Sequence, residues 1–252
     1  MITLDKLTKA VSEYLDPDTM KEYCPNGLQV EGAGEVKKVV TGVSACMELF
    51  EAAKERNSEA VIVHHGIIWN SGERTIKGSM RERVKYLLQN DISLLAYHLP
   101  LDRHPEVGNN AQIAKALGLE DLKSFGDYNG KAIGWTGVTG GPRSAEEFMD
   151  VIRSAINGSA SFHAFGPDTV EKVAVCSGGC QHMFHQAIKE KVDLFLTGEE
   201  SEWIFHLAKE EGIHYAAAGH HATERFGPIA LGEWISENLE VDVEFVDIHN
   251  PL

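Results

Sequence analysis

A short apolar stretch that ends in two adjacent histidines constrains this chain most. Residues 61–63 (Val-Ile-Val) lie between a polar segment, residues 57–59, and Gly66, which is the pattern of a short buried strand. His64 and His65 end the apolar run. Because side chains alternate between the two faces of a strand, these imidazoles can converge only where the chain leaves the sheet. Open α/β sheets place their sites at such carboxyl ends, so we interpret the pair as half of a metal site.

The bulk composition bounds the class of protein. The chain has 252 residues, enough for two modest domains with substantial cores. It has no run of 18 apolar residues, and residues 1–6 lack the basic and apolar regions of a signal peptide. Four cysteines are too few for a disulfide scaffold. We therefore expect a reduced, cytoplasmic protein that makes no membrane contact.

The formal charge of −15 restricts the partners. Nucleic-acid binding is disfavoured, because neutralising phosphates requires surplus Lys and Arg. A small anionic, nucleotide-like substrate is not excluded, since bound divalent cations can invert the local sign of charge.

Alternating strand and helix patterns predict an α/β fold that occurs twice. A strand at 36–43, a helix at 45–55 and the histidine strand form a βαβ unit, which implies a parallel sheet. A shift of 134 residues places this unit on a second strand, helix and strand between residues 173 and 197. We therefore expect two similar lobes, related by internal pseudo-duplication, each with a mixed, mostly parallel sheet flanked by helices. The expected lobes are 1–127 and 128–252, with the boundary set to within about ten residues and terminal elements free to exchange.

Two local patterns lie between the halves. Ser144 and Glu147 have the spacing of a capping box that starts a helix. The glycines at 137–141 lack the Lys-Ser/Thr of a phosphate-binding loop, so we expect only a turn there. The chain also lacks the Gly-x-Ser-x-Gly motif of serine hydrolases.

Three clusters of metal-ligand residue types occur at expected strand ends. They are His64-His65, His98-Leu99-Pro100-Leu101-Asp102 and His220-His221-Ala222-Thr223-Glu224. Imidazole and carboxylate ligands suit Zn, Fe, Mn or Co. Together the clusters offer more donors than one tetrahedral ion can use, which suggests two ions with Glu224 as the bridging candidate. Pro100 favours a loop from His98 to Asp102, from which only Asp102 need reach the ions.

Each cluster also has an ordinary structural explanation. A histidine pair can arise by coincidence in a chain with 12 histidines, and Asp102 alone is typical of a turn. His98 beside an apolar strand fits a hydrogen-bonded group near the ions better than a ligand. Glu224 alone is typical of a helix N-terminus. Their common placement at strand ends nevertheless favours a shared metal site, and Glu199, which the 134-residue shift aligns with His65, is a candidate for substrate binding or proton transfer.

An ordered set of motifs gives the chain a family resemblance. It consists of Asn26-Gly27-Leu28-Gln29-Val30, His64-His65-Gly66, Tyr97-His98-Leu99-Pro100-Leu101-Asp102 with Gly108-Asn109-Asn110, Thr197-Gly198-Glu199 and Gly219-His220-His221-Ala222-Thr223-Glu224. With these motifs the chain resembles the dinuclear-metal-centre hexameric family, the GTP cyclohydrolase I type 2 homologues (Nif-three-like proteins), in its short form. The resemblance implies two divalent ions, bridged by the glutamate and held by His64, His65, Asp102, His220 and Glu224. It implies no ligand role for His221.

The same resemblance implies a ring-shaped homohexamer and a purine ring-opening hydrolysis that releases formate from GTP. Water activated by the ions would attack the imidazole carbon of the base, and His98 or Glu199 would transfer the proton. The sequence itself identifies no guanine pocket. A phosphoesterase that uses the same ions, and a non-catalytic metal-binding assembly or regulatory protein, therefore stay open as alternatives. An open coordination position would separate an enzyme from a closed structural site.

Overall fold

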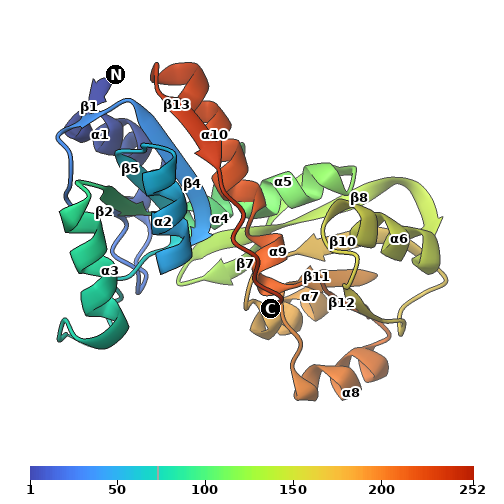
Figure 1. Cartoon of the computed structure of the whole chain (residues 1–252). Coiled ribbons are helices and arrows are strands. Elements are labelled where there is room, and N and C mark those ends of the chain that lie inside the picture. The colour runs from blue at the N-terminus through green and yellow to red at the C-terminus, as the bar shows by residue number, and fades with distance from the viewer. Residues whose placement is uncertain (73) are drawn as a thin grey trace. The chain divides into compact units, whose positions relative to one another are not determined.

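The chain divides into two compact units in the computed structural model, which describes residues 1–72 and 74–252. Unit 1 comprises Met1–Leu101 and Gly227–His249, and unit 2 comprises Asp102–Phe226 and Asn250–Leu252. The division lies at residues 101 and 102 rather than near residue 127, because β7 (Leu119–Tyr128) pairs with β8 (Lys131–Ser144) in the sheet of unit 2. The C-terminal segment returns to unit 1, where β13 (Asp242–Phe245) pairs with β4 (Lys38–Ser44) (Figure 1).

Unit 1 is built on a five-stranded sheet of order β13-β4-β5-β6-β2. The pairs β13–β4, β4–β5 and β5–β6 are parallel, and β2 is antiparallel to β6 at the edge. The elements not yet bounded are β1 (Ile2–Thr3), α1 (Leu4–Leu15), the 3-10 helix η1 (Pro17–Thr19), β2 (Gly27–Val30), β3 (Glu35–Val36), α2 (Met47–Glu55), β5 (Ala60–His65), α3 (Gly78–Gln89), β6 (Ser93–Ala96), α4 (Leu99–Arg103) and α10 (Phe226–Asn238).

Helices cover both faces of this sheet because its strands are apolar on both sides. Val40 and Val61 pack in one cluster with Leu49 of α2 and Leu87 of α3. On the opposite face Thr41 lies against α10, where the glycine at 232 allows close approach. Strands buried on both faces read as continuous apolar runs, as residues 61–63 do.

Unit 2 is built on a six-stranded mixed sheet of order β7-β8-β10-β11-β12-β9. Strands β10, β11 and β12 are parallel, and β8 and β9 flank them in antiparallel orientation. At one edge β7 is antiparallel to β8. The remaining elements are α5 (Asn109–Ala116), α6 (Ala145–Ala155), β9 (Ser161–His163), β10 (Thr169–Val175), the 3-10 helix η2 (Gln181–Met183), α7 (Phe184–Glu190), β11 (Leu194–Thr197), α8 (Glu202–Glu211), β12 (His214–Ala217) and α9 (His220–Thr223).

The sheet of unit 2 is also covered on both faces. Val173 and Leu194 pack against Phe148 of α6, whereas Phe195, on the other face, contacts Phe184 of α7. The capping box expected at the start of α6 is present: the Ser144 hydroxyl accepts from the backbone amide three residues on. The α/β class with mixed, partly parallel sheets flanked by helices is thus confirmed.

The parallel ladders of the two units have the same register. In unit 1 Val39 pairs with Ala60, and adding 134 to each number gives Val173 and Leu194, which pair in unit 2. The same shift relates the next two residue pairs of each ladder. This agreement supports an internal duplication, which stays a prediction.

Two local expectations are wrong. Residues 99–103 form helix α4 rather than a loop, because Pro100 lies in the first turn, where its missing N–H has no partner to lose. Residues 137–141 lie within strand β8 rather than in a turn. A Cβ on Gly137 would lie 2.8 Å from Leu122 Cδ2 and 3.0 Å from Glu120 O, so close packing explains the glycine.

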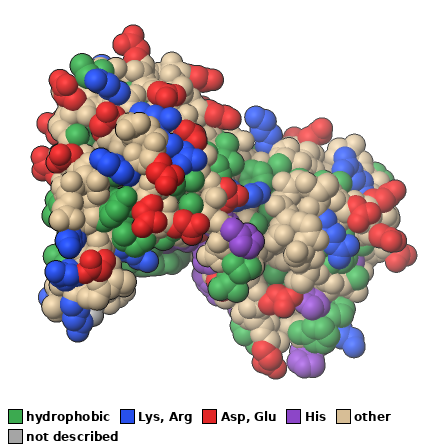
Figure 2. Space-filling view, viewed as in Figure 1, with side chains coloured by type: hydrophobic (Ala, Val, Ile, Leu, Met, Phe, Trp, Pro, Cys, Tyr) green, Lys and Arg blue, Asp and Glu red, His purple; other side chains and the backbone are tan. Residues whose placement is uncertain are grey.

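The surface carries charged side chains of both signs. On the face seen in Figure 2, Lys and Arg side chains are interspersed among Asp and Glu side chains. Within residues 1–72 and 74–252, every helix is too short or too polar to cross a membrane.

Candidate metal centre

Three histidines of unit 1 meet where two parallel strands end. His64 and His65 finish β5, and His98 follows its neighbour β6. One ring nitrogen from each lies within 4.8 Å of the other two. The ring centroids are 4.6 Å apart for His64 and His65, 4.9 Å for His64 and His98, and 5.5 Å for His65 and His98. His64 is 0% and His98 6% exposed. The structure therefore brings together the two expected ligands of unit 1 and His98.

Each of these rings makes a hydrogen bond through Nδ1. His64 Nδ1 lies 3.1 Å from the Tyr97 carbonyl oxygen, and His65 Nδ1 lies 3.2 Å from Ser44 Oγ. A carbonyl oxygen can only accept, so His64 Nδ1 carries the proton and its Nε2 keeps the lone pair that a metal requires.

The third ring is held by a carboxylate that the sequence interpretation missed. His98 Nδ1 donates to Glu22 Oε2 at 2.6 Å, and the Glu22 side chain is 1% exposed. Glu22 Oε1 accepts from Asn26 Nδ2 at 2.7 Å and from the Leu99 amide at 3.1 Å. Burial raises the pKa of Glu22, but its hydrogen bonds and the charge of His98 outweigh burial and hold that pKa below its usual value. Glu22 is one of 38 acidic residues and lies outside every motif, so nothing in the sequence singled it out.

The Asn-Gly-Leu-Gln motif near the start of the chain supports the histidine strand. Gln29 Oε1 accepts from the Ile67 amide at 2.9 Å and from the Ile68 amide at 3.1 Å. A Cβ on Gly66 would lie 2.3 Å from that same oxygen. The glycine after the histidine pair therefore lets the Gln29 side chain fix the turn that ends β5. Asn26 Oδ1 also accepts from the His98 backbone amide at 2.8 Å.

Asp102 is the first candidate ligand of unit 2. It is 5% exposed, and its Oδ1 accepts from Asn109 Nδ2 at 2.9 Å and from Ser177 Oγ at 3.0 Å. Ser177 in turn donates its backbone amide to Asn110 Oδ1 at 2.6 Å. These bonds fix the carboxylate through one oxygen. Asn109 and Asn110 belong to the Gly-Asn-Asn motif of the family resemblance, whereas Ser177 belongs to none of its motifs.

His220 and Glu224 form the second donor group of unit 2. Both lie at the ends of the short helix α9, and His220 Nε2 is 3.0 Å from Glu224 Oε1. His220 Nδ1 is 2.6 Å from Glu199 Oε1, and Gln181 donates to the other oxygen of Glu199 at 3.1 Å. Burial lowers the pKa of His220, but the two carboxylates outweigh burial and raise it to about 9. A carboxylate on the outer nitrogen of an imidazole is the usual support of a metal-bound histidine.

Glycines make room for this group. Gly178 has φ +61°, and a Cβ there would lie 2.1 Å from Glu224 Oε1 and 3.1 Å from His220 Nε2. The Gly178 amide donates to Thr223 Oγ1 at 3.0 Å, which holds its loop against α9. His221 is 8% exposed and donates its backbone amide to the Leu252 carbonyl at 2.9 Å.

The donor chemistry fits a divalent transition metal. Unit 1 offers imidazoles, which suit Zn, Fe or Cu ions. Unit 2 by itself offers two carboxylates and an imidazole, ligand types that Zn, Fe, Mn or Co accept. Groups of buried His, Asp and Glu side chains in the described residues could hold a metal ion. The outer hydrogen bonds that metal ligands need are already present in each unit.

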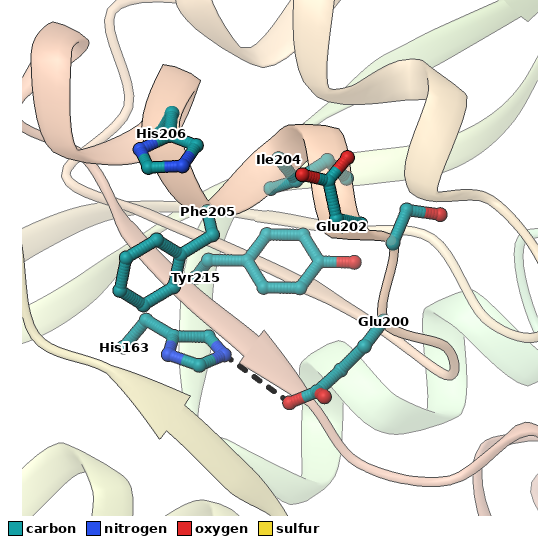
Figure 3. Close-up of a pocket in the computed structure, with 8 residues that line it drawn as sticks. His163, Glu200, Glu202, Ile204, Phe205, His206 and Tyr215 are labelled. Carbon is teal, nitrogen blue, oxygen red and sulfur yellow. Dashed lines mark hydrogen bonds and ion pairs between the residues drawn. The ribbon is translucent and has the colours of Figure 1, made fainter.

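A pocket of about 340 Å³ lies elsewhere in unit 2, where Phe205, His163 and Tyr215 form its aromatic side (Figure 3). The charged side chains that line it are Glu200 and Glu202, and His163 Nε2 lies 3.2 Å from Glu200 Oε1. The two carboxylates repel phosphate groups. This pocket is therefore unsuited to a nucleoside triphosphate.

Comparison with known proteins identifies the family. The family model described as Duf34/NIF3 (NGG1p interacting factor 3) matches residues 2–251. The chain belongs to the Duf34/NIF3 family. Similar proteins from Haemophilus influenzae (42% identical over 247 residues) and Escherichia coli K12 (43% identical over 247 residues) are each named GTP cyclohydrolase 1 type 2 homolog. Each alignment covers 98% of this chain and 98% of the relative.

Solved structures agree with this membership. A structure titled protein ybgI, of unknown function, has a TM-score of 0.95 and 42% sequence identity, with 100% of both chains covered. The structure of TTHA1606 from Thermus thermophilus has a TM-score of 0.92 and 32% identity, again with 100% of both chains covered. The family resemblance drawn from the motifs is thereby confirmed.

Proposed function

We propose that this protein is a metal-dependent hydrolase of the cyclohydrolase type, which opens the imidazole ring of a guanine nucleotide. Its expected ligands for two divalent ions are His64, His65, Asp102, His220 and Glu224, with the glutamate bridging. Bound ions would polarise the substrate and lower the pKa of a bound water molecule to about 7. The relatives named GTP cyclohydrolase 1 type 2 homolog suggest the substrate.

One observation carries the metal-binding part of this proposal. The three proposed imidazole ligands all make a hydrogen bond through Nδ1. The partners are Tyr97 O for His64, Ser44 Oγ for His65 and Glu199 Oε1 for His220. Structural histidines have no need to share one direction of support. A common use of Nδ1 is what ligation through Nε2 requires.

Proton transfer has two candidates, His98 and Glu199. Glu199 already holds the proton of His220 Nδ1 in a 2.6 Å hydrogen bond, and its side chain is 45% exposed, so it can exchange protons with solvent. His98 is buried and bound to Glu22. A group that transfers protons must lie about 2.6–3.2 Å from the heavy atom that carries the proton, or reach it through one water.

The test is formate release from GTP by the full chain loaded with a single metal at a time. We expect the unmodified protein to produce formate and a His65→Ala, Glu224→Ala double variant to fall to background. His182→Ala, which removes an exposed histidine, serves as the matched control and should keep full activity. Equal rates for unmodified protein and double variant, or no formate from any metal form, would reject the cyclohydrolase reaction.

We also propose self-association into a homohexamer, which rests on family membership alone. Light scattering of the metal-loaded chain should give a six-chain mass. A double variant that loses this mass as well as its metal would favour the alternative of a non-catalytic metal-binding assembly.

A further inference from the structure

We propose that the pocket lined by β9, β12 and α8 of unit 2 binds a small aliphatic cation with two primary ammonium groups, a linear diamine. Its volume of about 340 Å³ lies within the range of small-molecule sites. None of the eight lining residues is an expected metal ligand. The inference therefore requires neither the metal centre nor the proposed hydrolase reaction.

Aromatic side chains from three elements form one side of the pocket. His163 ends β9, Phe205 lies on α8 and Tyr215 lies on β12. The His163 ring centroid is 5.3 Å from that of Phe205, with 86° between the ring planes, and 6.3 Å from that of Tyr215, with 27° between them. The Phe205 ring is therefore steeply inclined to the Tyr215 ring. Phe205 is 43% exposed, so its ring is accessible to a cation, which an aromatic face attracts within about 6 Å of its centroid.

Contacts outside the pocket already hold these rings in place. The Phe165 ring, which does not line the pocket, has its centroid 5.2 Å from that of Phe205 and 6.0 Å from that of His163. Tyr215 is 1% exposed and forms the buried floor, and its hydroxyl donates to the Glu199 carbonyl oxygen. A ligand consequently loses little affinity to the ordering of these side chains.

The acidic side chains of the pocket keep oxygens for a ligand. Glu200 Oε1 accepts from the Ser161 hydroxyl and lies 3.2 Å from His163 Nε2, whereas Glu200 Oε2 makes no hydrogen bond to a described residue. The Glu202 carboxylate makes neither a hydrogen bond nor an ion pair within residues 1–72 and 74–252. No Lys or Arg is among the residues that line the pocket. Burial first, and then the charge of Glu200, raises the pKa of the Tyr215 phenol, so the negative charge extends to the floor of the pocket.

These features together select the class of ligand. Figure 3 shows the Glu200 and Glu202 carboxylates on one side of Tyr215 and the Phe205 ring on the other. A primary ammonium group brings three N–H donors to a carboxylate, whereas a quaternary ammonium group brings none. Two ammonium groups match the two carboxylates, and the methylene groups between them can pack on the aromatic rings. A divalent metal ion would use the carboxylates but gain nothing from the aromatic side.

The experiment titrates 1,4-diaminobutane into the full chain and follows aromatic ¹H–¹³C spectra. The signals of Phe205 and Tyr215 should shift and reach saturation. Butylamine, which has the same chain length and one ammonium group, should bind about 2- to 5-fold more weakly, the value of one exposed ion pair. The neutral 1,4-butanediol should cause no shift.

Three variants separate the contributions. Glu202→Gln should weaken diamine binding about 2- to 5-fold through loss of an exposed ion pair. Phe205→Leu keeps an apolar side chain but removes the aromatic face, and it should also weaken binding about 2- to 5-fold, followed at Tyr215. Glu210→Gln, at an exposed residue near the other end of α8, makes the same change in net charge and should leave binding unchanged.

Three outcomes overturn the inference while leaving the proposed function intact. The Phe205 and Tyr215 signals of the unmodified chain do not move with the diamine, a result that requires no variant to fold. Glu202→Gln and Glu210→Gln weaken binding equally, which is attraction to the acidic chain as a whole. Tetramethylammonium or Mg²⁺ binds as tightly as the diamine, which shows that the pocket does not recognise paired ammonium groups.

Discussion

Replacing Gly178 by alanine tests the geometry of the unit 2 donors most directly. The added Cβ would lie 2.1 Å from Glu224 Oε1, whereas ordinary contact begins near 3.4 Å, so the oxygen must retreat by about 1.3 Å. Metal–ligand distances tolerate about 0.2 Å. Such a displacement therefore removes Glu224 from any coordination shell. It also separates the oxygen from His220 Nε2, now 3.0 Å away.

The backbone contributes a second, separable cost. Gly178 has φ +61°, and an L-residue in that conformation costs roughly 1–2 kcal/mol. Gly118 is the matched control, because it has φ +67° and a Cβ there would meet no atom within 4 Å. Gly118→Ala should thus report the backbone cost alone, a drop in Tm of roughly 2–8 °C.

Two measurements on both variants test whether Gly178 controls the position of Glu224. Thermal unfolding of the metal-free chains should show a larger loss for Gly178→Ala, and isothermal titration with Zn²⁺ or Mn²⁺ should show affinity at least about 10-fold weaker for that variant only. If the two variants lose equal stability and bind metal alike, Gly178 does not control the position of Glu224.

Three further predictions concern single groups. Ser177→Ala removes a hydrogen bond to the Asp102 carboxylate and should lower the free energy of unfolding by about 1–2 kcal/mol in urea titrations. An unchanged midpoint would show that the bond contributes nothing. Burial and a neighbouring carboxylate raise the pKa of Cys24 to about 12, so iodoacetamide at pH 8 should label the half-buried Cys46 and Cys180 before Cys24. Mass spectra that show equal labelling of Cys24 would contradict this. The pKa of His220, raised from 6.5 to about 9, gives the metal-free chain stability that is complete below pH 6.5 and lost as pH rises through about 9. Its Tm should fall across that window, His220→Gln should remove the fall, and a flat profile in the unmodified chain argues against the raised pKa.

The strand ends could be predicted because their signals are local. A run of β-preferring residues bounded by turn residues predicts β5 without knowledge of its neighbours, and the same holds for Val173 in β10. The residue types at the strand ends then predict metal chemistry. A shift of 134 residues, found from sparse identities, matches the pairing register of the parallel strands.

The supporting residues could not be predicted because their partners are distant in sequence. Glu22 and His98 are 76 residues apart, and Ser177 and Asp102 are 75 apart. A glutamate or serine of this kind belongs to no local sequence pattern, and its role becomes visible only when the fold brings it next to its partner. The wrong expectations for α4 and residues 137–141 have a similar origin, since proline and glycine were interpreted as breakers without their neighbours.

The division of unit 1 into two chain segments has a consequence for synthesis on the ribosome. Strand β13, at the edge of the sheet beside β4, comes from Gly227–His249 and is translated long after the rest of that sheet. Domains usually fold in the order in which they emerge, amino-terminal first. Here residues 102–226 can finish first, while the nascent amino-terminal part waits with β4 unpaired at one edge. An exposed strand edge invites pairing with other chains, so this waiting period is when the nascent protein most needs a chaperone.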